Sequence, residues 1–487
     1  MTQLAPLPTN FNMAFYVLAK ARDLSKKPAL EILHPDRTEV WTYAQLNHAV
    51  RCFAAGLLAR GIGAGDTVLL RLGNTALFPV AYLGCIAIDA LPVPVSVQLT
   101  EPEIQTIKAE IAPRLTVSDT PTTHEVAVGG ISAPDPISDD QFVYGDPNRP
   151  AYIIYTSGTS GKPRAVVHAH RAIWARRMMW DGWYGLRAGD RVLHAGAFNW
   201  TYTLGTGLMD PWAIGATALI PAKGTDAACL PDLMARHRAT IFAAAPGVYR
   251  RMLRHAFPML PDLRHGLSAG ETMSPTLQSK WTRTTGTAVH QAFGMSECST
   301  FISGCPDRPA PAGAIGWIQD GRQVKLMPQT GEIAVHRSDP GMMLGYWGAQ
   351  AETCARFEGD WFRTGDLGTR TDEGAISYAG RIDDMMNAGG TRVSPVEVEA
   401  ALSAHPDITD VAVCAVQLDT DISLIAAFYV SADLLDHSRL DQFARAHLAA
   451  YKTPRIWVHS DTLPRGANNK LLRRKLRQDW EAAHGQA

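Results

Sequence analysis

Short apolar runs alternate with segments of helical periodicity from about residue 40 to residue 240. Strand-like runs include 66–72 (DTVLLRL), 114–118 (RLTVS) and 150–156 (PAYIIYT), and a helical pattern covers 77–90 (LFPVAYLGCIAIDA). Such alternation is typical of βαβ units. Because runs that are apolar at nearly every position suit strands buried on both faces, we predict an α/β fold with mainly parallel sheets.

The pattern changes twice in the second half of the chain. Between about 310 and 382, short strand-like runs stand among Gly- and Asp-rich turns, which predicts a small β-rich subdomain. From 383 to 487 helical and strand-like runs alternate again, over a length that suits an independent α+β domain. We therefore predict a large N-terminal domain over 1–382 and a small C-terminal domain over 383–487, with the boundary at Asp383.

Composition and charge exclude several classes of protein. The formal net charge of -1 over 487 residues provides no field for nucleic acid as the main partner. The N-terminal residues lack the pattern of a secretory signal, and no apolar run is long enough to span a bilayer. The seven cysteines show no metal-ligand spacing and suit a reducing compartment. We therefore expect a cytoplasmic protein without a membrane span.

The segment 155–168 (YTSGTSGKPRAVVH) follows an apolar run and precedes a helical pattern. Gly158 and Gly161 permit backbone conformations in which consecutive N–H groups converge on one point, and the neighbouring hydroxyl groups and Lys162 add further donors. This composition predicts a phosphate-binding loop. The spacing is not that of a Walker A motif, because only two residues separate the glycines and a proline follows the lysine. On its own, the loop also fits a flexible turn.

Four further motifs place polar groups at turns. Glu297 follows a glycine turn in HQAFGMSECS, Asp366 lies in WFRTGDLG, Arg381 lies in YAGRIDD, and Lys470 lies in RGANNKLLRRKLR. Each of these residues by itself also suits a solvated surface or an ordinary turn.

The five motifs together, in this order and at these spacings, resemble the adenylate-forming superfamily of acyl- and aryl-CoA synthetases, freestanding adenylation domains and luciferases. The resemblance covers about residues 30–477. It implies a large N-terminal domain of two mainly parallel sheets with helices and a β-barrel subdomain, followed by a small mobile α+β domain. It also implies a reaction in which a carboxylate attacks the α-phosphorus of ATP, releasing pyrophosphate. A thiol, usually that of coenzyme A, then displaces AMP from the acyl-adenylate.

The resemblance also implies roles for single residues. Glu297 would hold Mg²⁺, a cation that prefers oxygen ligands. Asp366 would bind the ribose hydroxyls, Arg381 would contact the ribose or phosphates, and Lys470 would reach the α-phosphate and the carboxylate as the catalytic cation. Thr156 and Glu297 complete the catalytic set. The loop that closes over the phosphates comprises Thr156, Ser157, Gly158, Thr159, Ser160, Gly161 and Lys162.

Other assignments follow from the same resemblance. Asp383 would be the hinge about which the small domain rotates between half-reactions. Three residues match the segment that faces the pantetheine tunnel of CoA: Gly389, Gly390 and Arg392. Five would form the floor beside the adenine: Gly270, Glu271, Ala292, Phe293 and Gly294.

The segment 194–208 (HAGAFNWTYTLGTGL) resembles the part of the family that lines the acyl pocket. It lacks an aspartate for a substrate amine, and a buried unpaired ammonium is costly, so an α-amino acid is not expected. Trp200 and Tyr202 favour an aromatic-walled pocket of the benzoate-CoA ligase type, although they also suit plain core packing. The predicted pocket comprises Phe198, Asn199, Trp200, Tyr202, Gly205, Ala269 and Gly294.

We therefore expect an ATP- and Mg²⁺-dependent acyl-CoA synthetase for a small aryl or short-to-medium-chain carboxylic acid. One alternative is a freestanding adenylation enzyme that loads a carrier-protein phosphopantetheine. Others are a non-catalytic ligand-binding member of the fold and a luciferase-like oxidation of the adenylate.

Overall fold

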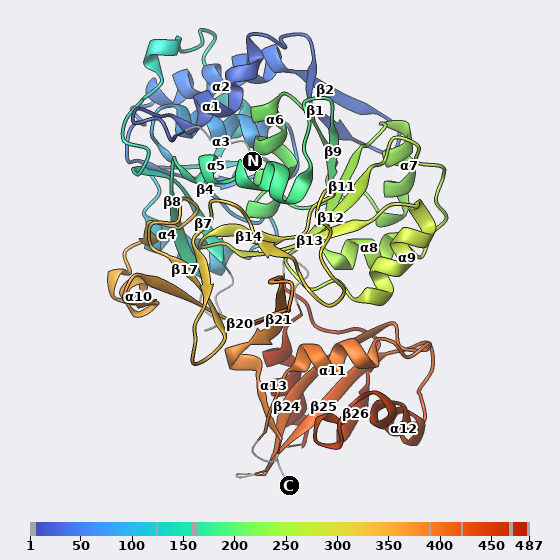
Figure 1. Ribbon diagram of the computed structural model, residues 1–487. Helices are drawn as coiled ribbons and strands as arrows, with labels where there is room; N and C mark the ends of the chain where they lie inside the picture. Colours follow the sequence, from blue (N-terminus) through green and yellow to red (C-terminus); the bar gives the residue numbers. More distant parts are fainter. Residues whose placement is uncertain are drawn as a thin grey trace.

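The computed structural model describes residues 6–122, 125–156, 163–388, 391–419, 422–466 and 471–484. Figure 1 shows a large N-terminal part, coloured blue to yellow, above a smaller C-terminal part in orange and red. The fold is the expected mixed α/β fold with a large N-terminal and a smaller C-terminal domain. None of the helices in the described part of the chain is long and apolar enough to cross a membrane.

A nine-stranded sheet forms the centre of the large domain, in the order β15-β14-β13-β12-β11-β9-β10-β1-β2. The six strands from β13 to β1 pair in parallel, while β2, β14 and β15 add antiparallel edges. Helices α7, α8 and α9 bury apolar side chains against this sheet. The strands are β1 (Pro28–Leu33), β2 (Thr38–Thr42), β9 (Arg191–His194), β10 (Thr217–Pro221), β11 (Ile241–Ala244), β12 (His265–Ala269), β13 (Val289–Met295), β14 (Ser299–Ser303) and β15 (Trp317–Ile318), and the helices are α7 (Leu230–Arg236), α8 (Pro246–Met252) and α9 (Pro275–Thr285).

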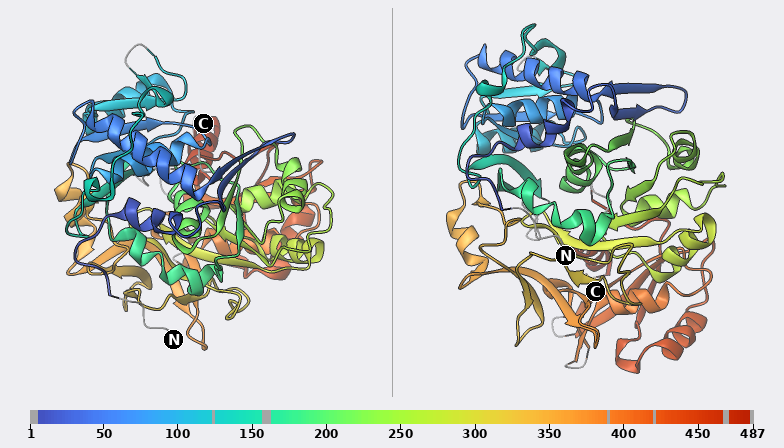
Figure 2. Two further views of the ribbon diagram at one scale, coloured as in Figure 1. Left: turned by 90° about the horizontal axis from the view of Figure 1, so that it is seen from above. Right: turned by 45° about the horizontal axis from the view of Figure 1, so that its top comes forward.

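A second, four-stranded parallel sheet has the order β4-β3-β5-β6. Helix α2 begins at a capping box in which Thr42 and Gln45 bond each other's backbone N–H groups. Helix α3 is apolar on all sides and almost wholly buried, as expected for a helix inside a layered domain. In both views of Figure 2 this blue region lies beside the green-to-yellow sheet. The elements are α2 (Tyr43–Leu58), β3 (Thr67–Arg71), α3 (Leu77–Ala87), β4 (Leu91–Pro94), α4 (Glu101–Ile111), β5 (Leu115–Ser118) and β6 (Val126–Ala127).

The predicted phosphate loop joins two antiparallel strands, β7 (Pro150–Thr156) and β8 (Arg164–Ala169). A helix was expected directly after the loop, and this expectation was wrong for residues 164–169, which form a strand. Residues 164–169 pair with both β7 and β18 (Gly345–Tyr346), so contacts distant in sequence decide their conformation.

The predicted β-rich region forms a five-stranded antiparallel sheet. Its closure into a barrel stays a prediction. The strands are β16 (Val324–Leu326), β17 (Glu332–His336), β19 (Phe357–Glu358), β20 (Trp361–Arg370) and β21 (Ile376–Arg381), and α10 (Gln350–Ala355) lies between β18 and β19.

The C-terminal domain has a sheet of its own with a separate apolar core on each face. Alternate residues of β24 separate to the two sides: Val411 and Val413 join one core, and Ala412 and Cys414 join the other. Two cores that share no residue with the large domain explain why this segment forms a unit. Its elements are β22 (Met386–Ala388), β23 (Thr391–Val393), α11 (Pro395–Leu402), β24 (Asp410–Asp419), β25 (Ile422–Val430), α12 (His437–His447), β26 (Ile456–His459) and α13 (Arg473–His484).

Candidate active site

Thr156 ends strand β7 and lies opposite Arg164 on β8, so the two strands hold the ends of the phosphate loop side by side. The remaining loop residues assigned from the sequence, 157–162, lie outside the described residues. Arg164 forms an ion pair with Glu352 at 3.2 Å, and its guanidinium lies over the ring of Tyr346. The loop is therefore anchored next to Tyr346, which also contacts Glu297.

Glu297 lies in the turn between β13 and β14, and its side chain is buried. The Tyr346 hydroxyl donates a hydrogen bond to Oε1 of Glu297 at 2.9 Å. Burial and the charge of Glu297 raise the pKa of Tyr346, which keeps this hydroxyl protonated as a donor. Oε2 accepts no hydrogen bond from the residues that the structure describes, so this oxygen is suited to a ligand.

Gly294 brings the two strands of this turn into close contact. A Cβ atom there would lie 2.5 Å from the Cα of Thr300, and closer still to the carbonyl oxygen of Ser299. Only glycine allows this approach, which sets the direction of the Glu297 turn. The neighbouring Phe293 packs against Tyr378 with the two rings tilted and their centroids 5.5 Å apart.

Asp366 and Arg381 face each other across the β20–β21 pair. The Arg381 Nη1 donates to Oδ2 of Asp366 at 2.9 Å, and the Tyr378 hydroxyl donates to Oδ1 at 2.9 Å. Burial and the charge of Asp366 raise the pKa of Tyr378, so this hydroxyl also stays protonated. Together, Arg381 and Tyr378 fix the orientation of the Asp366 carboxylate.

The predicted acyl-pocket segment runs from the end of β9 into the π-helical turn η5 (Thr203–Met209). Trp200 lies directly on Gly270, where a Cβ would be 2.7 Å from the indole. Tyr202 packs edge-on against Trp200 with centroids 5.1 Å apart and donates its hydroxyl to the carbonyl oxygen of Leu267. Ala269 and Ala292 belong to the same apolar cluster. These residues form one aromatic wall beside the β12 loop.

Phe198 and Asn199 have different surroundings. The ring of Phe198 is fully buried 5.2 Å from that of Phe78, and its backbone N–H is held by Oδ1 of Asn74. Both residues line an open hollow with a volume of about 290 Å³. Lys223 and Arg251 also line it, and it lies at the carboxyl ends of β3, β4, β9 and β10, where ligands of α/β sheets bind.

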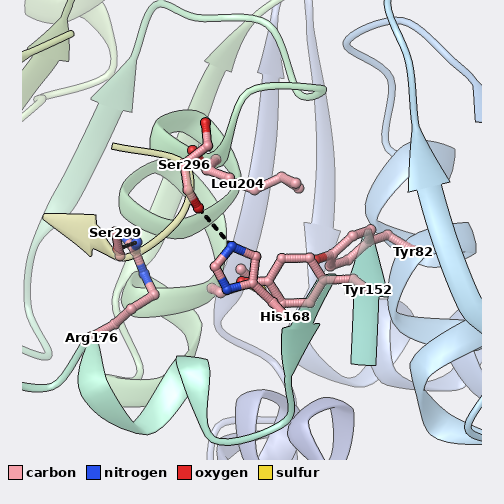
Figure 3. Close-up of a pocket in the computed structure, with 9 residues that line it drawn as sticks. Tyr82, Tyr152, His168, Arg176, Leu204, Ser296 and Ser299 are labelled. Atoms are coloured by element: carbon pink, nitrogen blue, oxygen red, sulfur yellow. Dashed lines mark hydrogen bonds between the residues drawn. The ribbon is translucent and has the colours of Figure 1, made fainter. Parts of the chain in front are cut away.

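A second, smaller cavity adjoins the acyl-pocket segment. It is lined by Thr201 and Leu204 of that segment, by His168 of β8, and by Ser296 beside Glu297. Figure 3 shows these side chains with Arg176, Tyr82 and Tyr152, and the hydrogen bond from His168 to the carbonyl oxygen of Ser296.

Arg465 of the C-terminal domain joins the two domains. It forms ion pairs with Glu271 at 3.1 Å and with Asp410 at 2.8 Å, and Arg250 approaches Asp410 at 3.3 Å. Arg465 also bridges to Leu471, the first described residue after the Lys470 segment. The described ends of that segment are thus held beside Glu271, a residue expected near the adenine.

The remaining sequence assignments fall at the domain junction. Asp383 is exposed in the turn η7 (Ile382–Asp384) between β21 and β22. Lys470, Gly389 and Gly390 lie outside the described residues, and only the backbone of Arg392, in β23, is described.

Sequence reasoning did not find Tyr346, Tyr378 or the Arg176 cluster. No spacing in the sequence relates Tyr346 to Glu297 or Tyr378 to Asp366, because both pairs form only when separate strands meet. One signal in the sequence that could have indicated this cluster is Asp210, the single charged residue in the segment 203–214.

Contacts among β8, the β13–β14 hairpin and the β20–β21 pair therefore link the base of the loop after β7 to Glu297, Asp366 and Arg381. Family comparison agrees with this arrangement: residues 18–347 match the AMP-binding enzyme model, and residues 397–470 match the model of the AMP-binding enzyme C-terminal domain. The chain belongs to the AMP-binding enzyme family.

Two relatives match this chain over nearly its whole length. A 3-hydroxybenzoate–CoA/4-hydroxybenzoate–CoA ligase of Thauera aromatica is 30% identical over 91% of this chain and 92% of its own. A benzoate–CoA ligase of the same organism is 30% identical over 97% of this chain and 96% of its own.

Solved structures show the same fold. An anthranilate CoA ligase in complex with anthranoyl-AMP has a TM-score of 0.89 at 24% identity, covering 99% of this chain and 100% of that chain. A benzoate CoA ligase from Burkholderia xenovorans LB400 has a TM-score of 0.83 at 25% identity, covering 96% and 100%.

Proposed function

We propose that the protein is an AMP-forming acid–thiol ligase that converts an aryl carboxylic acid to its CoA thioester. The observation that carries this proposal is the unbroken series of contacts between the assigned segments. Arg164 at the phosphate loop contacts Tyr346, which binds Glu297, and Phe293 of the same hairpin contacts Tyr378, which binds Asp366. ATP and an acid bound along this series would place their reacting atoms together.

In the first half-reaction, an oxygen of the carboxylate attacks the α-phosphorus of ATP, and the bond from phosphorus to pyrophosphate breaks. Asp366 would orient the ribose by accepting hydrogen bonds from its hydroxyls, and Arg381 would hold Asp366 in place. Lys470 would stabilise the negative charge that develops at the α-phosphate. A magnesium ion held by Glu297 and phosphate oxygens would supply further positive charge to the leaving pyrophosphate.

The donor set suits such an ion only in combination with a nucleotide. Among the described residues no cluster of three or more His, Cys, Asp or Glu side chains is present. Mg²⁺ commonly binds through one or two carboxylates plus phosphate oxygens and water, so a single oriented carboxylate is sufficient.

In the second half-reaction, the CoA thiol gives up its proton and attacks the acyl carbon, and the bond to AMP breaks. Rotation about Asp383 would carry the C-terminal domain between the two half-reactions, with the domain boundary at that residue. The hollow lined by Lys223 and Arg251 has the size and the basic groups that suit a long anionic thiol. Near-full-length similarity to CoA ligases favours CoA over a carrier protein as the acceptor.

An aryl acid suits the pocket because Trp200 and Tyr202 form a rigid aromatic wall. Aromatic rings prefer offset-stacked or edge-on neighbours, and this wall offers both a face and an edge. The relatives named for benzoate and hydroxybenzoate support the same substrate class.

Acid-dependent ATP–pyrophosphate exchange over a panel of aryl and C2–C10 acids tests the proposal, followed by CoA thioester formation. The substitution Lys470→Ala is expected to lower exchange about 10²–10³-fold, as does removal of one transition-state donor. Lys475→Ala is the matched control, since Lys475 is exposed on α13 and pairs only with its helical neighbour Asp479. It should leave exchange unchanged. Absence of exchange with every acid would contradict the proposal.

A further inference from the structure

Arg176 lies inside the N-terminal domain as the centre of a buried polar cluster. Its Nε and Nη2 form a two-point ion pair with Asp210, at distances from 2.6 to 3.1 Å. Nη2 also donates to the hydroxyls of Tyr184 and Thr206. The guanidinium and carboxylate neutralise each other, and the residues around them fix their positions. Such a cluster is costly to bury, which suggests a use beyond packing.

Arg176, at the centre of this cluster, lines the cavity shown in Figure 3. The cavity has a volume of about 20 Å³. That volume accommodates roughly one water. The cavity as it stands therefore suits a small polar substituent and not a whole aromatic ring.

Two buried polar atoms at this cavity have no hydrogen-bond partner among the described residues: Nδ1 of His168 and the hydroxyl of Tyr82. The Nε2 of His168 contacts the carbonyl oxygen of Ser296 at 2.7 Å. Because a carbonyl only accepts, Nε2 carries the proton and Nδ1 presents a lone pair. Burial lowers the pKa of His168 to about 4, so the ring is neutral at neutral pH.

The opposite wall supplies donors. Nη1 of Arg176 donates one hydrogen to the Ser299 hydroxyl at 3.0 Å and retains a second. Ser299 adopts a left-handed backbone conformation with φ of 59°, an unfavourable state for a residue with a Cβ. Strain of this kind often accompanies a side chain positioned for function.

The cavity adjoins the proposed acyl site. Thr201 and Leu204, which line it, flank Tyr202 of the aromatic wall. Gly205 lies against the Arg176 guanidinium so closely that any Cβ would overlap it. The acyl-pocket segment therefore contacts the aromatic wall and the Arg176 cluster at once, and a ring held by Trp200 and Tyr202 would direct a substituent towards this space.

We propose that this cavity, named here the hydroxyl pocket (Tyr82, His168, Arg176, Thr201 and Ser299), receives a hydroxyl group on the ring of the aryl acid. The proposal rests on the function proposed above. A hydroxyl both donates and accepts: its hydrogen would bond Nδ1 of His168, and its oxygen would accept from Arg176 or Tyr82.

Other substituents match the pocket less well. A second carboxylate would face the His168 lone pair, and Asp210 already neutralises the Arg176 charge. A chlorine or methyl group would leave Nδ1 and the Tyr82 hydroxyl unsatisfied, and a site built to bond a hydroxyl rejects analogues that lack it.

The test compares kcat/KM for ATP–pyrophosphate exchange with benzoate and with 2-, 3- and 4-substituted hydroxy-, chloro- and methoxybenzoates. At one ring position the hydroxy acid is expected to exceed its chloro counterpart by at least about tenfold, the equivalent of a single good hydrogen bond. Methoxy at that position should lose the preference, because it cannot donate to His168.

Two variants locate the preference in this cavity. Tyr82→Phe removes an unpartnered buried hydroxyl, so the variant should fold, and the hydroxy-to-chloro ratio should fall at least about threefold. The double substitution Arg176→Met with Asp210→Leu removes both charges together, which avoids a lone buried ion. In this variant the hydroxy-to-chloro ratio of kcat/KM should fall to about one. Tyr43→Phe, which affects a hydroxyl bonded to Ala216 outside the site, should keep the wild-type ratio.

Equal rates for hydroxy and chloro acids at every position would overturn the hydroxyl pocket, as would a ratio unchanged in both variants. Benzenedicarboxylates are assayed alongside this panel; a preference for them would overturn the hydroxyl pocket too and would assign a carboxylate to Arg176. Exchange with benzoate but without a hydroxyl preference would leave the proposed ligase function intact, whereas no exchange with any acid would overturn both proposals.

Discussion

Two tyrosine hydroxyls hold the two carboxylates that we assign to the nucleotide. Tyr346 fixes Glu297 and Tyr378 fixes Asp366, each through a hydrogen bond of 2.9 Å. In Glu297 the other carboxylate oxygen is thereby presented in a defined direction, whereas Arg381 holds the second oxygen of Asp366. At the scale of the residue, the geometry of the site therefore depends on Tyr346 and Tyr378, which hold the carboxylates, as much as on the motif residues themselves.

The substitution Tyr346→Phe tests this positioning. Glu297 would keep its charge but lose its fixed orientation, so the Mg²⁺ concentration for half-maximal exchange should rise about tenfold. Saturating Mg²⁺ should restore most of kcat, a result that a general loss of structure would not produce. Tyr43→Phe again serves as the control. An unchanged Mg²⁺ requirement would contradict the role assigned to Tyr346.

At the scale of the element, the β13–β14 hairpin determines where Glu297 and the Ser299 wall of the hydroxyl pocket lie. Gly294 allows the two strands to approach, and the following turn returns the chain within a few residues to Ser299. One hairpin thereby supplies Glu297 to the proposed Mg²⁺ site and Ser296 and Ser299 to the cavity.

Gly294→Ala is expected to destabilise the protein by about 2 kcal/mol, the middle of the range for an overpacked site, because the added Cβ meets backbone that has no room to move. The midpoint of urea unfolding measures the effect. Gly189→Ala is the matched control: its Cβ would enter open space, and the change should lie within about 0.5 kcal/mol of zero. Equal midpoints for the two variants would contradict this account of the hairpin.

The hydrophobic pattern was sufficient to predict most elements. Strands such as β3 and β7 and helix α3 are largely buried, and their sequences are correspondingly apolar. The pattern failed at β8, whose conformation depends on β7 and β18. The composition of the loop at 156–162 predicts phosphate binding, and the roles of the other motif residues come from the family resemblance. Their partners, Tyr346 and Tyr378, and the Arg176–Asp210 pair were not predictable, since only the folded sheets bring them together.

At the scale of the whole molecule, the Arg465 cluster holds the two domains in one relative arrangement. Arg465 joins Glu271 of the large domain to Asp410 of the small one, and Arg250 supports Asp410 from the large domain. The cluster is only partly exposed, so solvent screens these ion pairs less than pairs on the open surface.

Arg465→Ala should therefore weaken this arrangement. Because the same arrangement holds the described ends of the Lys470 segment beside Glu271, exchange should fall at least about tenfold. Transfer of a pre-formed aryl-adenylate to CoA should be much less affected. Arg445→Ala is the control, as Arg445 pairs only within α12. An equal loss of both half-reactions would contradict an arrangement specific to adenylation.

The most direct test of the central claim follows one oxygen atom through a complete turnover. The protein is supplied with ATP, Mg²⁺, CoA and a hydroxybenzoate whose two carboxylate oxygens are both ¹⁸O, and the AMP produced is analysed by mass spectrometry. Attack of the carboxylate on the α-phosphorus, followed by cleavage of the acyl–oxygen bond, predicts one ¹⁸O in each AMP. Thioester formation with unlabelled AMP, or with ADP and phosphate as products, would contradict an acyl-adenylate intermediate.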